Sequence, residues 1–66
     1  MEVIANGERV ALADGAHLTD LLTVLGLGEK WVVAERNGEA VERVDMPATA
    51  LAEGDRIELV RAVAGG

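Results

Sequence analysis

The chain has 66 residues, of which 50% are hydrophobic and 27% are charged, a balance typical of one small globular domain. Twelve acidic residues against six basic ones give a net charge of −6, which disfavours nucleic-acid binding because phosphate contacts need a basic surface. Without cysteine, the chain has no disulfide, no catalytic thiol and no cysteine ligand for a metal. No apolar run approaches the roughly 20 residues of a membrane span. Since the start also lacks a basic leader, we expect a cytoplasmic protein without membrane contact.

The first part of the chain predicts a β-hairpin. Asn6-Gly7 separates residues 2–5 from residues 8–12, and both segments are rich in apolar side chains. Asn-Gly accepts the positive φ angles that a type I′ turn requires at both central positions, which makes this pair a strong hairpin signal. Asp14-Gly15 then turns the chain out of the hairpin.

A short helix is predicted next. Four leucines at helical spacing form its apolar stripe: Leu18, Leu21, Leu22 and Leu25. We expect Thr19 as the N-cap, Asp20 in the first turn and Gly26 in a left-handed conformation at the C-terminal end. A helix of about two turns is not stable alone, so it must pack on a sheet.

The second half of the chain predicts another hairpin and a connection. Asn37-Gly38 is again a type I′ signal, with strands expected over residues 31–36 and 39–41. Residues 46–51 are too mixed for a regular element and predict an irregular connection with at most a single 3₁₀ turn.

The last strand is predicted from residue 56 onward. Ile57 and Leu59 share one of its faces, while Glu58 and Val60 share the other. Because a single helix serves well as a crossover, we expect the first and last strands to pair in parallel at the centre of the sheet. The predicted fold is therefore an α+β β-grasp, with one helix packed on a mixed four- to five-stranded sheet. Residues 1–63 are expected to form this domain and residues 64–66 a C-terminal tail.

The sequence offers no set of side chains for an enzyme or a metal site. His17 is the single histidine and has no thiol and only scattered acids to act with. The informative feature is the terminal Gly65-Gly66, because two residues without side chains suit a tail that enters a narrow channel. We expect the α-carboxylate of Gly66 to be free and to be the reactive group. The positions expected to thread into partner active sites are Ala62, Val63, Ala64 and Gly65.

A candidate docking patch is predicted beside this tail. Residues 31–34 are apolar on both faces of a strand, although one helix can cover only one face of a sheet. An exposed apolar patch marks an interaction site. The predicted patch consists of Trp31, Val32, Ala34 and Val60.

Taken together, these segments resemble the ThiS family of sulfur carriers, which have a ubiquitin-like β-grasp fold. The resemblance covers the whole chain, and its most specific part is the strand Gly54-Asp55-Arg56-Ile57-Glu58 that continues into Ala62-Val63-Ala64-Gly65-Gly66. The leucine stripe and the Asn-Gly turns are shared more widely among ubiquitin-like folds. Glu42 and Met46 stand where many members of the family carry proline and tryptophan.

The resemblance implies a protein co-substrate and not an enzyme. A ThiF-type enzyme would adenylate the carboxylate of Gly66 with ATP, and a persulfide donor would convert the adenylate into a thiocarboxylate. A ThiG-type thiazole synthase would then take the sulfur for thiamin synthesis. The carrier itself would bind no cofactor.

Two alternatives stay open. A thiocarboxylate carrier of the same fold would serve tRNA thiolation or molybdopterin synthesis instead of thiamin synthesis. The alternative from a different class is a non-catalytic β-grasp binding module of the TGS type, which needs no Gly-Gly end. Deletion of Gly65-Gly66 separates the classes, because it abolishes the function of a carrier only.

Overall fold

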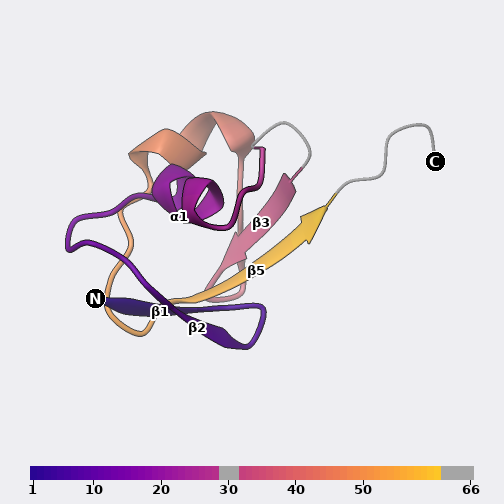
Figure 1. Ribbon diagram of the computed structural model, residues 1–66. Helices are drawn as coiled ribbons and strands as arrows, with labels where there is room; N and C mark the ends of the chain where they lie inside the picture. Colours follow the sequence, from indigo (N-terminus) through magenta and orange to yellow (C-terminus); the bar gives the residue numbers. More distant parts are fainter. Residues whose placement is uncertain (29–31, 62–66) are drawn as a thin grey trace.

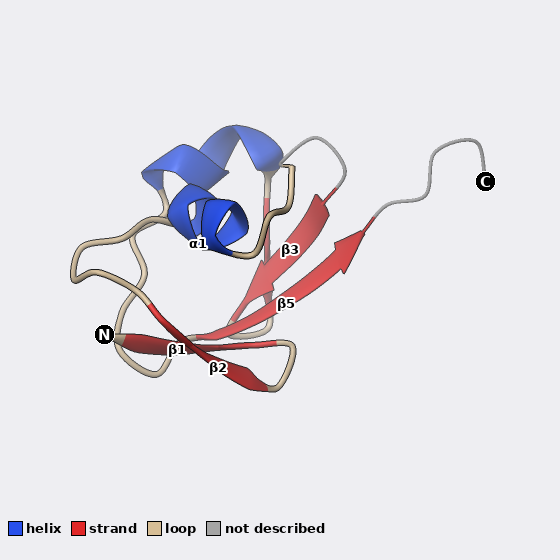
Figure 2. Cartoon of the chain, in the orientation of Figure 1, coloured by secondary structure: helices blue, strands red, loops and turns tan. Residues whose placement is uncertain are grey.

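One mixed sheet carries a helix and a 3₁₀ segment on the same side (Figures 1 and 2). The computed structural model describes residues 1–28 and 32–61. Their elements in chain order are β1 (Glu2–Ala5), β2 (Glu8–Ala11), α1 (Leu18–Val24), β3 (Val32–Arg36), β4 (Glu39–Val41), the 3₁₀ helix η2 (Arg43–Ala48) and β5 (Arg56–Arg61). The five strands lie in the order β2-β1-β5-β3-β4. β5 is central, parallel to β1 and antiparallel to β3, which confirms the predicted β-grasp.

Both predicted hairpins form, and each turns at its Asn-Gly pair. Asn6 and Gly7 have φ angles of 50° and 82°, and Asn37 and Gly38 have φ angles of 52° and 86°. These values satisfy the type I′ turn, which needs positive φ at both central residues. The flanking strands close in antiparallel register directly at each turn, with Ala5 opposite Glu8 in the first hairpin.

The helix begins two residues earlier than its predicted cap would require. His17 is the N-cap, and the expectation of Thr19 as N-cap is wrong. The carboxylate of Asp20 reaches back and accepts a hydrogen bond of 2.7 Å from the backbone N–H of His17. This contact satisfies a backbone donor at the helix start, so the first turn is fixed by its acid and not by a threonine hydroxyl. Gly26 has the predicted positive φ, at 71°.

The connection after β4 is more regular than predicted. It contains the six-residue 3₁₀ helix η2, which starts at Arg43 and ends at Ala48, whereas the sequence predicted an irregular stretch from residue 46. The i→i+3 pattern is visible in the hydrogen bond of 2.9 Å that Asp45 N–H donates to the carbonyl of Glu42. Met46 on this segment is only 1% exposed, so the segment is held by core packing that its short apolar pattern did not reveal.

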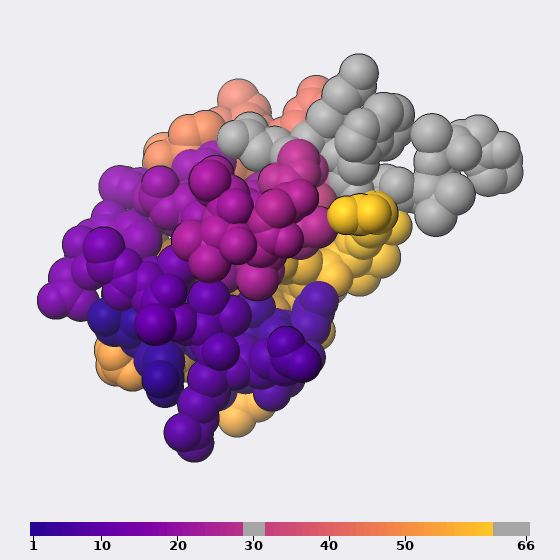
Figure 3. Space-filling model, viewed as in Figure 1, coloured from indigo at the N-terminus to yellow at the C-terminus, as the bar shows by residue number. Residues whose placement is uncertain are grey.

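The core lies between the sheet and the two helical segments. Its buried apolar residues are Val3, Ala5, Leu12, Ala16, Leu18, Leu21, Leu22, Val32, Ala34, Met46, Leu51, Ile57 and Leu59. They come from β1, α1, β3, η2, β5 and the connecting segments, which explains how a helix of seven residues is stabilised: it contributes three buried leucines to a shared core. In the space-filling view (Figure 3), the end of β5, in yellow, reaches the surface. Among the described residues, no helix is long and apolar enough to cross a membrane.

Candidate functional site

The candidate site is the end of β5, because this strand leads along the chain to the predicted reactive terminus. Arg61 is the last described residue, and it lies opposite Val32 at the end of the sheet. The tail positions predicted to be functional lie outside the described residues: Ala62, Val63, Ala64, Gly65 and Gly66. Trp31 of the predicted docking patch also lies outside them. What the structure places is therefore the base from which the tail starts.

The predicted docking patch is wrong in two of its residues. Val32 and Ala34 are 8% and 0% exposed and face the core, so neither can form an open docking surface. The reason is the period-two alternation of β3: the residue opposite Ala34 on β5 is Leu59, and both point toward the helix side. Val60, by contrast, is 63% exposed and stays in the patch.

Val33 takes the place of the two buried residues. It is 56% exposed and lies directly opposite Val60 across the β3–β5 ladder, so the two side chains share the face of the sheet away from the helix. We call Val33 and Val60 the valine pair. The alternation of β3 contained the signal for Val33, because a run that is apolar on both faces must expose one of its two sets of side chains.

An acidic pair adjoins the valine pair on the same face. Glu35 and Glu58 lie directly opposite each other on β3 and β5, and both are exposed. Like charges in directly opposed positions of a sheet are destabilising. Arg56 shares this face two residues before Glu58, and toward the end of β5 the acidic pair adjoins the apolar valine pair.

Two asparagine side chains bind β5 from its two sides. Asn6 donates from Nδ2 to the carbonyl of Leu59 at 3.1 Å and accepts at Oδ1 from the N–H of Leu59 at 2.8 Å. Asn37 accepts at Oδ1 from the N–H of Arg56 at 2.9 Å. The residues that make the two hairpin turns therefore also hold the central strand, one near its start and the other near its end.

Asp55 is the buried charged side chain of the described core and anchors the start of β5. Its carboxylate accepts hydrogen bonds from Arg36 Nε at 3.0 Å, from Asn37 Nδ2 at 3.0 Å and from the backbone N–H of Ala52 at 2.8 Å. Burial acts to raise the pKa of Asp55, but the hydrogen bonds from Asn37, Ala52 and Arg36 together with the Arg36 charge outweigh it and lower the pKa. The group is therefore a structural carboxylate held in its charged form.

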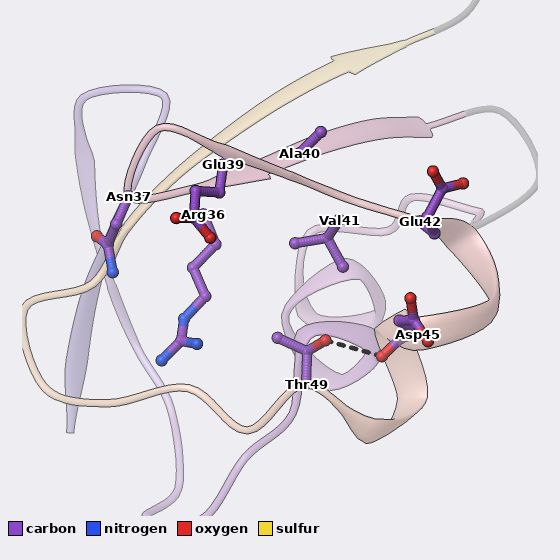
Figure 4. A pocket seen from close by; sticks show the side chains of 8 residues that line it. All are labelled: Arg36, Asn37, Glu39, Ala40, Val41, Glu42, Asp45 and Thr49. Carbon is purple, nitrogen blue, oxygen red and sulfur yellow. Dashed lines mark hydrogen bonds between the residues drawn. The ribbon is translucent and has the colours of Figure 1, made fainter.

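A shallow hollow of about 480 Å³ lies between the second hairpin and η2 (Figure 4). Its lining residues are Arg36, Asn37, Glu39, Ala40, Val41, Glu42, Asp45 and Thr49. The hydroxyl of Thr49 donates to the backbone carbonyl of Asp45 at 2.7 Å. Arg36 is engaged with Asp55, and the carboxylates in the hollow are exposed, so the lining has the character of a solvated surface.

Catalytic and metal chemistry find little support in the described part of the chain. At the helix start, the backbone N–H of His17 donates to the carboxylate of Asp20. The distance from Nδ1 of His17 to a carboxylate oxygen of Asp20 is 3.8 Å. Within residues 1–28 and 32–61, no three His, Cys, Asp or Glu side chains are grouped so that they could hold a metal ion.

Comparisons with known proteins agree with the fold and with the family resemblance. The model of the ThiS family matches residues 1–66. A crystal structure of the thiamine biosynthesis protein ThiS from Geobacter metallireducens has a TM-score of 0.82 and 32% identity, with all of both chains covered. The solution structure of a thiamine biosynthesis protein from the same organism has a TM-score of 0.79 and 33% identity, covering all of this chain and 88% of the other.

A longer protein is also similar. The thiazole synthase of Paramagnetospirillum magneticum is 32% identical over 66 residues, and this chain spans 20% of its length. The family model matches the whole chain, and the two similar structures point to the same family. The chain belongs to the ThiS family.

Proposed function

We propose that this chain carries sulfur on the C-terminal carboxylate of Gly66 and delivers it to thiazole synthesis in the thiamin pathway. The observation that supports this proposal most directly is the position of β5. This strand is central in the sheet, is paired on both sides, and is the element from which the chain continues toward Gly65-Gly66. A strand held on both sides gives the tail a rigid base, while the glycines present no Cβ to a partner's active site.

The chemistry follows from the poor reactivity of a carboxylate. Attack of a Gly66 carboxylate oxygen on the α-phosphate of ATP forms an acyl adenylate and releases pyrophosphate, which supplies a good leaving group. The terminal sulfur of a persulfide then attacks the acyl carbon and expels AMP, giving an acyl disulfide. A thiol cleaves the sulfur–sulfur bond of this intermediate, is itself oxidised to a disulfide, and leaves the thiocarboxylate. The carrier needs no cysteine of its own, and this chain has none.

The proposed partners are a ThiF-type adenylating enzyme that uses ATP, a persulfide donor and a ThiG-type thiazole synthase. The printed name of the similar Paramagnetospirillum protein, thiazole synthase, supports the last of these. For docking we propose the outer face of the sheet, with the valine pair against an apolar partner surface and Glu35 and Glu58 against basic side chains. No cofactor is proposed for the carrier itself.

The decisive test is the whole-protein mass after incubation with ATP, a ThiF-type enzyme, a persulfide donor and a thiol. We expect an increase of about 16 Da, the exchange of one oxygen for sulfur, located on the C-terminal peptide. The matched control is a chain with one alanine added after Gly66, which should gain no mass because its terminal carboxylate is displaced from the position that the adenylating enzyme reaches.

The alternatives are separate outcomes of the same assay. If only an activating enzyme of tRNA thiolation or molybdopterin synthesis modifies the chain, the carrier serves that pathway and the thiamin assignment is wrong. No modification by any activating enzyme, together with retained cellular function after deletion of Gly65-Gly66, would favour a TGS-type binding module.

A further inference from the structure

The two Asn-Gly turns differ in where they hold β5. Asn37 binds Arg56, at the start of the strand, through both its backbone and its side chain: its N–H donates to the carbonyl of Arg56 at 2.8 Å, and its Oδ1 accepts from the N–H of Arg56. Asn6 binds farther along, at Leu59, near the end from which the tail continues. Each asparagine has the positive φ that its turn requires, so one residue serves both the turn and the contact with β5.

Asn6 continues the pairing between β1 and β5 after β1 has ended. The backbone ladder runs from Ile4 N–H to the carbonyl of Asp55 at 2.8 Å and from Asn6 N–H to the carbonyl of Ile57 at 2.9 Å. At that point the chain turns away into β2. The next edge position of β5 is Leu59, and the amide of the Asn6 side chain binds both its N–H and its carbonyl, as the backbone of a neighbouring strand would.

We propose that Asn6 is a positioning residue that fixes the direction in which the chain leaves β5 toward Gly66. On the other side of β5, β3 holds residues 57–61 through the antiparallel ladder. The contact at Leu59 supplies the constraint on the β1 side closest to the tail. Without it, the edge-facing groups of Leu59 pair with water, and the end of β5 is held from one side only.

This inference rests on the proposed function, in which partner enzymes must receive the tail in one orientation. A base that points the tail correctly lowers the ordering that each partner must impose, since rigid preorganisation reduces the entropy lost on binding. Loss of the Asn6 contact should therefore raise KM for the carrier, because more carrier is needed to occupy the adenylating enzyme. It should not change kcat, the rate of adenylation once the tail is bound.

Asn6→Gly tests the inference, with Asn37→Gly as the matched control. Glycine keeps the positive φ of either turn and removes the side-chain contact with β5. Each variant loses two side-chain hydrogen bonds. One of those lost in Asn37→Gly goes to the charged Asp55, so the control should lose at least as much stability as Asn6→Gly. We expect Asn6→Gly to raise KM for the carrier about five- to ten-fold with kcat within about two-fold, as the loss of one or two hydrogen bonds allows. Asn37→Gly should leave KM within about two-fold of the wild type.

Two further measurements keep a positioning role separate from a structural one. Amide exchange at Leu59, Val60 and Arg61 should accelerate in Asn6→Gly and stay near wild type in Asn37→Gly. Asn6→Asp should raise KM less than Asn6→Gly does, because its carboxylate still accepts a hydrogen bond from Leu59 N–H. Should Asn6→Gly not fold, Asn6→Asp is compared with the wild type and with Asn37→Gly, since it keeps the acceptor for Leu59 N–H and loses the amide donor.

The outcomes distinguish this inference from the function on which it rests. Equal KM values for Asn6→Gly and Asn37→Gly, with a wild-type chain that is adenylated normally, would overturn the positioning role and leave the carrier function intact. A wild-type chain that no adenylating enzyme modifies would overturn both, whatever the exchange rates at the end of β5.

Discussion

At the scale of single residues, Asp55 shows why a buried acid is tolerated in so small a core. Three donors from two segments converge on its carboxylate: Arg36, Asn37 and the N–H of Ala52. A buried polar group costs free energy unless its hydrogen bonds are made, and here they are made. The same contacts join the second hairpin to the turn before β5, so the acid acts as a tie between two parts of the chain.

Asp55→Asn should lower the free energy of unfolding at pH 7 by about 2–3 kcal/mol, the usual range for hydrogen bonds to a charged group. The asparagine has one oxygen where the aspartate has two, so its Nδ2 must face a donor. Denaturant unfolding of the two proteins measures the difference. Equal stabilities would show that the carboxylate contributes nothing beyond its shape.

The same residue predicts a pH dependence with a definite sign. The pKa of Asp55 in the folded protein lies below its ordinary value of 3.8, so the unfolded chain binds the proton more readily. The stability that Asp55 contributes is therefore fully present above pH 3.8 and is lost as the pH falls through the lower folded value. The difference in unfolding free energy between wild type and Asp55→Asn should be constant at neutral pH and shrink in acid. A difference that grew in acid would contradict the lowered pKa.

At the scale of elements, the parts of the fold that could be predicted are those determined by local chemistry. Asn-Gly pairs specify their own turns. The inward face of β5 could be predicted because Ile57 and Leu59 alternate with polar residues along the strand. β3 was harder because residues 31–34 are apolar at every position, so the pattern alone does not say which set faces the helix. Register with β5 decides it, and register is a tertiary property that places Val32 and Ala34 inside.

The helix start and η2 illustrate the same limit. Thr19 is a good N-cap by residue type, but the acid at position 20 binds the N–H of His17 and starts the helix earlier. η2 has little periodicity and is held by Met46, whose burial depends on contacts between η2 and α1. The exposure of Val60 on β5 was predicted, while the asparagine contacts with β5 could not be predicted because they join residues 53 and 19 positions apart.

The buried stripe of α1 gives a stability prediction. Leu22→Ala should cost about 2–5 kcal/mol, because Leu22 is 1% exposed and truncation leaves a cavity. Leu25→Ala is the control: Leu25 lies at the C-cap and is 39% exposed, so its truncation should cost less than about 1 kcal/mol. Thermal or denaturant unfolding compares them. A harmless Leu22→Ala would mean that the helix does not present this face to the core.

The outer face of β3 and β5 gives a binding prediction. Val60→Thr keeps a β-branched side chain on the strand and makes the valine pair partly polar, so the fold should be retained. Val24→Thr is the matched control, because Val24 is 60% exposed on α1 and Val60 is 63% exposed on β5. We expect KM for the adenylating enzyme to rise about three- to ten-fold for Val60→Thr only, a range set by the free energy of one buried methyl group. Equal values for the two variants would exclude the valine pair from docking.

At the scale of the whole molecule, the proposed function assigns separate tasks to the domain and to the terminus. The core is built from residues between Val3 and Leu59, and β5 connects that core to the predicted reactive end. A domain this small has little stability to spare, since roughly 60% of its unfolded surface is all that it can bury. A protein of this kind does best when the residues that enter partner enzymes are not also the residues that hold the fold.

One substitution in the terminus and one in the core test that separation. Gly66→Ala should lower adenylation strongly, because a Cβ next to the reacting carboxylate occupies space in a channel that accepts glycine, while the melting temperature changes by no more than about 2 °C. Leu22→Ala should do the reverse: it should lower the melting temperature by about 10 °C or more, while KM and kcat per folded molecule stay near wild type. Calorimetry and adenylation kinetics on the same preparations give both quantities. A large loss of stability in Gly66→Ala would show that the terminus packs against the domain, and the domain would then be more than a base for its tail.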